Sequence, residues 1–251
     1  MSRYTGLKAV FKREFQGYFA TPLGYIFLVI FLMASGWLTV SRDFGQFLEI
    51  RQAALTPFFR FLPHIFVMLV PAVAMRLWAE ERKTGTVELL FTLPITLEGS
   101  YLGKFLAGWS FLGVALLLTF PMVIWVAILG DPDWGTIITG YLGSFLLAGA
   151  FLAIGMLFSA LTKNQVVSFI LSVAASVSLL SLGLPQVLEF FGSIAFIGGY
   201  LEQILAALSL FDHFHSLTRG LLEFRVFAFF AVLIVGWLGC GMMLLNQLKA
   251  S

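Results

Sequence analysis

Between Asp133 and Lys163 the chain runs WGTIITGYLGSFLLAGAFLAIGMLFSALT (residues 134–162), which is 29 residues without a charge. A helix needs roughly 20 apolar residues to cross the ~30 Å hydrocarbon core of a bilayer. This stretch is long enough to do so, and its charges stand only at its two ends. It therefore predicts a membrane-spanning helix over residues 135–161.

Four more uncharged stretches are long enough to cross a bilayer. They hold 27 residues between Glu14 and Arg42, 26 between Lys104 and Asp131, 25 between Lys163 and Glu189, and 23 between Arg225 and Lys249. A shorter stretch of 15 residues lies between Arg60 and Arg76, whose long side chains can extend to the interface. We therefore expect an all-α integral membrane protein with six transmembrane helices, at about residues 22–41, 58–78, 105–129, 135–161, 165–186 and 226–247.

The composition argues against the soluble classes of protein. Apolar residues make up 60% of the 251 residues and charged residues only 11%, whereas a soluble domain carries about a quarter charged residues. The net charge of +2 gives no basic surface for nucleic acid, and the single cysteine, Cys240, excludes a disulfide framework within the chain. We expect one membrane domain over residues 1–251.

The basic residues indicate how the chain is oriented in the membrane. With the N-terminus in the cytoplasm, ten Lys and Arg residues fall in cytoplasmic segments and five in external segments. Basic residues are enriched on the cytoplasmic side of membrane proteins. We therefore expect both termini in the cytoplasm.

Two segments outside the expected spans have helical patterns of their own. In residues 3–19, apolar and basic side chains fall on opposite faces of a helix, which predicts an interface helix in the headgroup layer with its apolar stripe in lipid. Residues 187–222 are apolar but broken by Gly and acidic residues. They predict re-entrant or interfacial outer helices at about 187–198, 200–211 and 213–222.

The loop over residues 79–100 is longer than a simple connection needs. Thr84 or Gly85 would start a short helix over residues 84–93, and Pro94 would end it. Gly85 would supply the turn before this helix, because glycine adopts positive φ without steric cost. The loop is acidic at both flanks, where a helix bound to anionic lipid would be basic, so it suggests a docking element for a protein partner.

Small residues recur four apart in the expected span over residues 135–161. The pairs are Ser144 with Ala148, Gly149 with Ala153, and Gly155 with Ser159. In lipid this spacing lets helix backbones approach closely. It predicts a packing face, either inside one subunit or between two subunits.

The chain lacks the motif that would let it bind a nucleotide. In the pattern G-x-x-x-x-G-K-[ST], which cradles phosphates, Gly103-Lys104 would be the Gly-Lys pair. However, Glu98 stands where the first Gly should be and Phe105 where Ser or Thr should be. The energy for any transport would therefore come from a partner.

An enzyme site is not indicated either. The zinc-protease motif H-E-x-x-H is missing, and His213 and His215 do not share a helical face with a third ligand. The Glu80-Glu81 pair is similar to the start of a prenyl-protein protease motif, but position 85 is Gly where that motif has Arg. An intramembrane protease stays the enzyme alternative, and we expect no catalytic, cofactor-binding or metal-binding residue.

Residues 81–95, ERKTGTVELLFTLPI, followed by Gly103-Lys104, resemble the signature of the ABC-2 type permease family. The opening Lys12-Arg13-Glu14-Phe15 and the stretch 213–220 ahead of the last span are also similar to this family. Within the family, the length and the loop before the last span are most similar to the permease of gliding-motility ABC transporters.

The resemblance implies the permease subunit of an ATP-driven exporter, in a prokaryotic cytoplasmic membrane. Two copies, or this chain and a homologue, would form the pathway, and a separate ATPase dimer would bind ATP and Mg and supply the energy. Membrane lipid and an extracytoplasmic auxiliary subunit are further implied partners. A membrane scaffold or assembly subunit that transports nothing is the alternative from another functional class.

The resemblance also implies roles for individual residues. Residues 84–93 would be the coupling helix that docks in the ATPase, and residues 3–19 would be the interface helix beside it. The outer segment would close the pathway through a gate with Ile194, Phe196 and Glu202. The contacts with the ATPase would come from Glu81, Gly85, Thr86, Glu88, Leu89, Leu90 and Phe91.

Overall fold

The computed structural model of the chain describes residues 3–47, 49, 52–86, 96–193 and 198–250. It is 84% helical, and the described ranges contain no strand, so the predicted all-α class is confirmed. In chain order the helices are α1 (Arg3–Ala20), α2 (Pro22–Val40), α3 (Thr56–Ala74), α4 (Arg76–Thr84), α6 (Leu97–Leu117), α7 (Phe120–Leu129), α8 (Trp134–Leu161), α9 (Gln165–Ser181), α10 (Pro185–Gly192), α11 (Gly198–Ala207), α12 (Leu210–Thr218) and α13 (Phe224–Ala250).

Within the described residues, five helical stretches are long and apolar enough to cross a membrane. Two of them combine consecutive helices, α3 with α4 and α6 with α7. These stretches coincide with five of the six spans expected from the sequence, and the chain is an integral membrane protein. Their bounds are Pro22–Val40, Thr56–Thr84, Leu97–Leu129, Trp134–Leu161 and Phe224–Gln247.

The remaining expected span, residues 165–186, is not one continuous helix. α9 ends at Ser181, and the chain bends by 76° into α10. Pro185 is the first residue of α10. A backbone N–H at this position would have no partner within the helix, so its absence in proline costs no hydrogen bond. At Gly183 a Cβ atom would lie 2.0 Å from Oγ of Ser209, so the bend is packed tightly against the start of α12. The part of the chain that the structure describes has six candidate spans only if this bent pair counts as one.

α8 is the central helix of the bundle. In its most apolar window 72% of the residues are buried, compared with 28% for α13. At Gly149 a Cβ atom would lie 2.8 Å from Nε1 of Trp109, and at Gly155 it would lie 2.4 Å from Cβ of Ala74. Gly149 and Gly155 of α8 therefore let neighbouring helices of the same chain approach closely. At these two positions the packing face lies inside one subunit, which is one of the two alternatives that the sequence left open.

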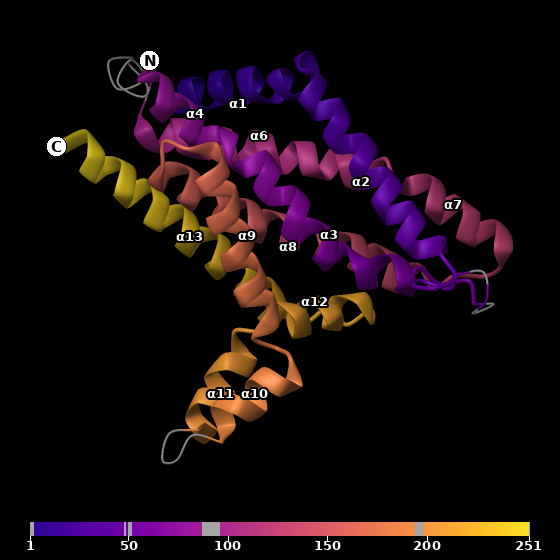
Figure 1. Cartoon of the computed structure of the whole chain (residues 1–251). Coiled ribbons are helices and arrows are strands. Elements are labelled where there is room, and N and C mark those ends of the chain that lie inside the picture. Colours follow the sequence, from indigo (N-terminus) through magenta and orange to yellow (C-terminus); the bar gives the residue numbers. More distant parts are fainter. Residues whose placement is uncertain (1–2, 48, 50–51, 87–95, 194–197, 251) are drawn as a thin grey trace.

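α1 runs across the end of the bundle at which both termini lie (Figure 1). It packs on α6, where Gly99, Gly103 and Gly108 leave room for Leu7, Val10 and Tyr18 of α1. α1 covers the residues of the helix predicted over residues 3–19, and the placement of its apolar stripe in lipid stays a prediction. Part of that stripe contacts another helix of the same chain.

The outer segment forms three short helices, as expected, with different bounds. α10 and α11 pack against each other and project beyond the far end of α9 (Figure 1). α12 packs on α8 instead. This difference leaves α10 and α11 attached to the bundle chiefly through the chain connections at residues 182–184 and 208–209.

The close contact of α8 with α3 gives a first prediction. Gly155→Leu should lower the free energy of unfolding by about 1–3 kcal/mol, because a larger side chain must displace Ala74. Thermal unfolding of the detergent-purified protein measures this. Gly236→Leu on α13 is the control, since a Cβ atom there meets nothing within 4 Å. Equal melting temperatures for the two variants would contradict the packing described here.

Candidate functional site

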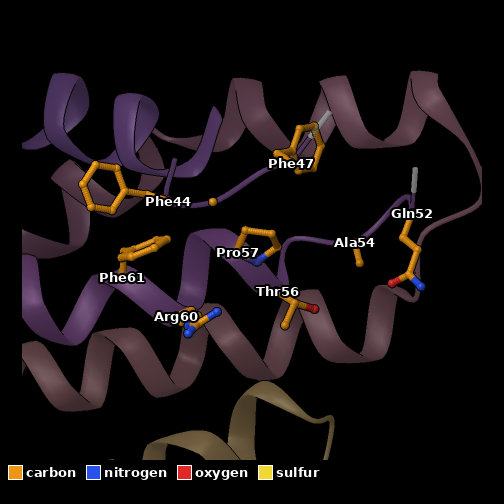
Figure 2. Close-up of a pocket in the computed structure, with 9 residues that line it drawn as sticks. Phe44, Phe47, Gln52, Ala54, Thr56, Pro57, Arg60 and Phe61 are labelled. Atoms are coloured by element: carbon orange, nitrogen blue, oxygen red, sulfur yellow. The ribbon is translucent and has the colours of Figure 1, made fainter. Parts of the chain in front are cut away.

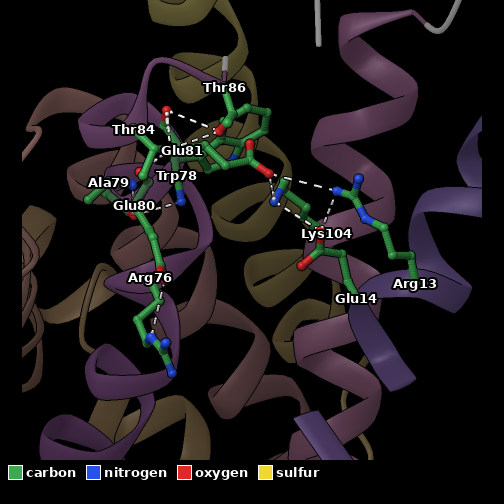
Figure 3. Close-up of polar contacts among 11 residues, drawn as sticks. Arg13, Glu14, Arg76, Trp78, Ala79, Glu80, Glu81, Thr84, Thr86 and Lys104 are labelled. Carbon is green, nitrogen blue, oxygen red and sulfur yellow. Dashed lines mark hydrogen bonds and ion pairs between the residues drawn. The ribbon is translucent and has the colours of Figure 1, made fainter. Parts of the chain in front are cut away.

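A buried lysine joins three helices near the end of the bundle where α1 lies (Figure 3). Lys104 of α6 is 2% exposed. Its Nζ donates to Oε1 of Glu14 in α1 at 3.1 Å and to Oε1 of Glu81 in α4 at 2.8 Å. Arg13 donates to Glu14 at 2.7 Å and lies 3.7 Å from Glu81. We call Arg13, Glu14, Glu81 and Lys104 the lysine cluster.

The lysine cluster is electrically balanced, with two basic and two acidic side chains. A buried charge is costly unless it is paired and hydrogen-bonded. Burial raises the pKa of the Glu14 carboxyl, but the Lys104 ammonium and the Arg13 guanidinium outweigh this effect and hold that pKa below its ordinary value. Glu14 is therefore ionised at neutral pH and remains the partner of Lys104.

Aromatic residues close the inner side of the lysine cluster. Nζ of Lys104 lies 5.3 Å from the ring centroid of Trp78, a distance typical of a cation–π contact. Trp78 is fully buried and stacks on Tyr101, with ring centroids 5.4 Å apart. These rings shield the ion pairs from water, which strengthens the attraction between their charges.

α4 is also tied to the central helix. The helix is interrupted at Met75, between the end of α3 and the start of α4, and backbone groups there lose their partners within the helix. Oγ of Ser159 in α8 donates to the Met75 carbonyl at 2.9 Å and accepts from the amides of Trp78 and Ala79, each at 3.0 Å. Arg82 donates to the carbonyl of Ala160. α4 is thus held by α8 on one side and by the lysine cluster on the other.

The family model for ABC-2 family transporter proteins matches residues 9–246. This match covers nearly the whole chain. The chain belongs to the ABC-2 transporter family. No curated protein matches the sequence. Membership makes the chain a membrane permease subunit of an ABC transporter and implies an ATPase partner.

In this ABC-2 permease, Gly85 has the conformation expected from the sequence. Its φ is +73°, and it caps the C-terminal end of α4. Thr84, however, ends α4 and does not begin a new helix, because the helix that follows Met75 continues through it. Thr86 is exposed, and its hydroxyl donates to the carbonyl of Glu81 at 3.3 Å. Gly85 therefore marks the point where the chain leaves α4.

The remaining predicted site residues fall into two groups. Glu202 lies on α11, where a Cβ atom on Gly192 would lie 2.9 Å from its carboxylate, so it faces α10. Six others lie outside the described residues: Glu88, Leu89, Leu90, Phe91, Ile194 and Phe196.

Glu81, which was predicted to contact the ATPase, is paired within the chain, and its contact with the ATPase stays a prediction. Its side chain is 20% exposed, and its Oε1 atom is bound by Lys104 of the same chain. Its Oε2 atom is buried without a hydrogen-bond partner among the described residues. The prediction missed Lys104, although Gly103-Lys104 and Glu14 were both in the stretches that resemble the family. No signal in the sequence indicated that α6 begins at Leu97, about two helical turns before Lys104.

A pocket lies at the end of α2 and α3 that is far from the lysine cluster (Figure 2). Its volume is about 180 Å³, and Phe44, Phe47, Arg60 and Phe61 are among its lining residues. It shares no residue with the lysine cluster. We therefore take the lysine cluster, with α4 and Gly85, as the candidate functional site of the permease.

The buried ion pairs give a second prediction. Lys104→Met should cost about 3 kcal/mol of stability, because it leaves the partly buried carboxylates of Glu14 and Glu81 without their shared cation. Thermal unfolding of the purified permease measures the change.

The control for this variant is Arg42→Met. Arg42 pairs with Glu49 at 3.7 Å, but the two side chains are 89% and 53% exposed. Exposed pairs contribute about 0–1 kcal/mol, so this variant should melt close to the wild type. If both variants lost the same stability, the lysine cluster would be no more than another surface ion pair.

Proposed function

We propose that this permease forms the translocation pathway of an ATP-driven exporter as a dimer, driven by a separate ATPase dimer that binds ATP and Mg. The observation that carries the proposal is the attachment of α4. The chain continues from α4 through Gly85 into residues 86–95, which match the family signature. α4 itself is bound to α1, α6 and α8.

In the proposed mechanism the coupling helix is the segment over residues 84–93. Closure of the ATPase dimer on ATP would move this segment, and α4 would pass the displacement to the bundle. Two routes are available in the described residues, Lys104 toward α1 and α6, and Ser159 toward α8. Packed interfaces of this kind have discrete arrangements, so a small displacement can switch the pathway between closed and open states.

The proposed ATPase contacts divide into two kinds. Gly85 and Thr86 are exposed at the end of α4, and we propose that they meet the ATPase together with Glu88, Leu89, Leu90 and Phe91. Glu81 would act through Lys104, because the lysine already occupies one of its carboxylate oxygens. Glu81 is therefore proposed as a positioning residue for the coupling helix.

At the other end of the pathway, we propose that α10, α11 and the residues between them, with Ile194, Phe196 and Glu202, form the outer gate. The support for this is the weak attachment of α10 and α11 to the rest of the bundle, which would let them move as a unit. Exposed apolar side chains such as Phe190 and Tyr200, at 68% and 74%, are also unusual for an external aqueous loop.

A third prediction concerns the ATPase contact. Gly85→Val should abolish ATPase co-purification, because valine tolerates the observed positive φ poorly. Phe91→Ala and Glu88→Lys should do the same, since truncating a central anchor of an interface often costs ~2 kcal/mol, roughly 30-fold in affinity. The measurement is the amount of ATPase retained by the affinity-purified permease, together with coupled transport.

Membrane insertion should be normal in all three variants. Arg42→Ala, at the other end of the bundle, is the matched control and should retain the ATPase. If the three variants hold the ATPase and transport at the wild-type rate, residues 84–93 are not the coupling element.

A fourth prediction concerns orientation. In a Cys240→Ser background, a cysteine at position 132 should react with a membrane-impermeant reagent in intact cells, whereas a cysteine at position 95 should not. The ten-to-five distribution of basic residues supports this orientation. The reversed labelling pattern would place the coupling segment outside the cell and would rule out the proposed ATPase contact.

A further inference from the structure

A groove with a polar end and an apolar floor lies between α1, α2, α3 and α4. Its volume is about 350 Å³, which is within the range of small-ligand pockets. Arg76, Glu80 and Thr21 line its polar end, together with Glu14 of the lysine cluster. Ile26, Ile30, Leu69 and Val73 line the apolar part. This groove is adjacent to the lysine cluster but is not needed to explain it.

The dimensions of the groove fit an acyl chain. Between Leu23 and Ile30 a helix rises by about 10 Å at 1.5 Å per residue, which is most of one leaflet of a ~30 Å hydrocarbon core. Ile26 and Ile30 are 52% and 47% exposed, so the groove is open along α2 to the surface of the bundle. A lipid tail can therefore enter it from the side.

The charges at the polar end select the headgroup. Arg76 and Glu80 are four residues apart on α4, with Nε of Arg76 3.4 Å from Oε2 of Glu80, and Figure 3 shows this pair separate from Lys104. Only Nε of the guanidinium takes part, and such i, i+4 pairs are weak. The guanidinium can bind a phosphate, and the Glu80 carboxylate can accept from an ammonium group.

We infer that this groove binds a zwitterionic phospholipid with a primary ammonium group, a phosphatidylethanolamine. Its phosphate lies on Arg76, its ammonium group on Glu80, and one acyl chain lies along Ile26, Ile30 and Leu69. An anionic headgroup without an amine can pair with Arg76 alone, and the Glu80 carboxylate repels it. A choline headgroup carries no N–H group to donate to Glu80.

Native mass spectrometry of the full-length purified permease tests this inference. Titrated with phosphatidylethanolamine or phosphatidylglycerol of the same acyl chains, the wild type should bind the ethanolamine lipid about tenfold more tightly. Glu80→Gln should abolish that preference by lowering the affinity for the ethanolamine lipid. Arg76→Gln should lower the affinity for both lipids about tenfold. Lys83→Gln, an exposed charge on the same helix, should change neither affinity.

The inferred position of the acyl chain is tested by Ala72→Trp, which fills the groove and should lower the affinity for both lipids. Met68→Trp places the same ring one turn earlier on α3, at an exposed position outside the groove, and should have no effect. Equal or tighter binding of phosphatidylglycerol to the wild type would overturn the inference, as would unchanged binding to Glu80→Gln. A disulfide-linked dimer through a cysteine at position 72, without lipid binding, would show that a second copy covers the groove.

Discussion

The arrangement of this permease depends on a single ammonium group with almost no access to water. Lys104 is 2% exposed, yet it lies within a helix long and apolar enough to span a membrane. Its charge is tolerable only because Glu14 and Glu81 approach it from two other helices. That requirement fixes the distance between α1, α4 and α6 more tightly than apolar packing alone, since apolar contacts are not directional.

The second constraint is the break between α3 and α4. Unpaired backbone groups in an apolar surrounding cost free energy, so the break persists only where a partner is supplied. Ser159 supplies it, and the neighbouring Gly155 lets α8 come close enough to do so. The small residues of α8 thus have two effects: they allow close helix packing, and they bring a hydroxyl to the break between α3 and α4.

Much of this fold follows from counting charges, but the candidate site does not. Uncharged stretches predicted six spans, because lipid excludes charge along a whole helix, and five of them coincide with helical stretches long enough to cross a membrane. The same count treated Lys104 as the boundary of a span, whereas the structure places it inside a helix that begins at Leu97, where carboxylates from other helices neutralise it. The bend after Ser181 was also missed, and there Gly183 packs against the start of α12, a segment distant in sequence. Gly85 was predicted correctly because its positive φ is a local property.

The two ends of the molecule differ in how firmly they are held, and this difference bears on transport. At one end α4 is bound to three helices through ion pairs and backbone hydrogen bonds, so a displacement at Gly85 cannot be absorbed locally. At the other end α10 and α11 contact chiefly each other and follow a 76° bend. A force applied to α4 is therefore transmitted through the rigid bundle, and the weakly held pair is where the smallest free energy is needed for a change of position. This order, rigid where energy would enter and loose where the pathway would open, fits the proposed drive by a separate ATPase.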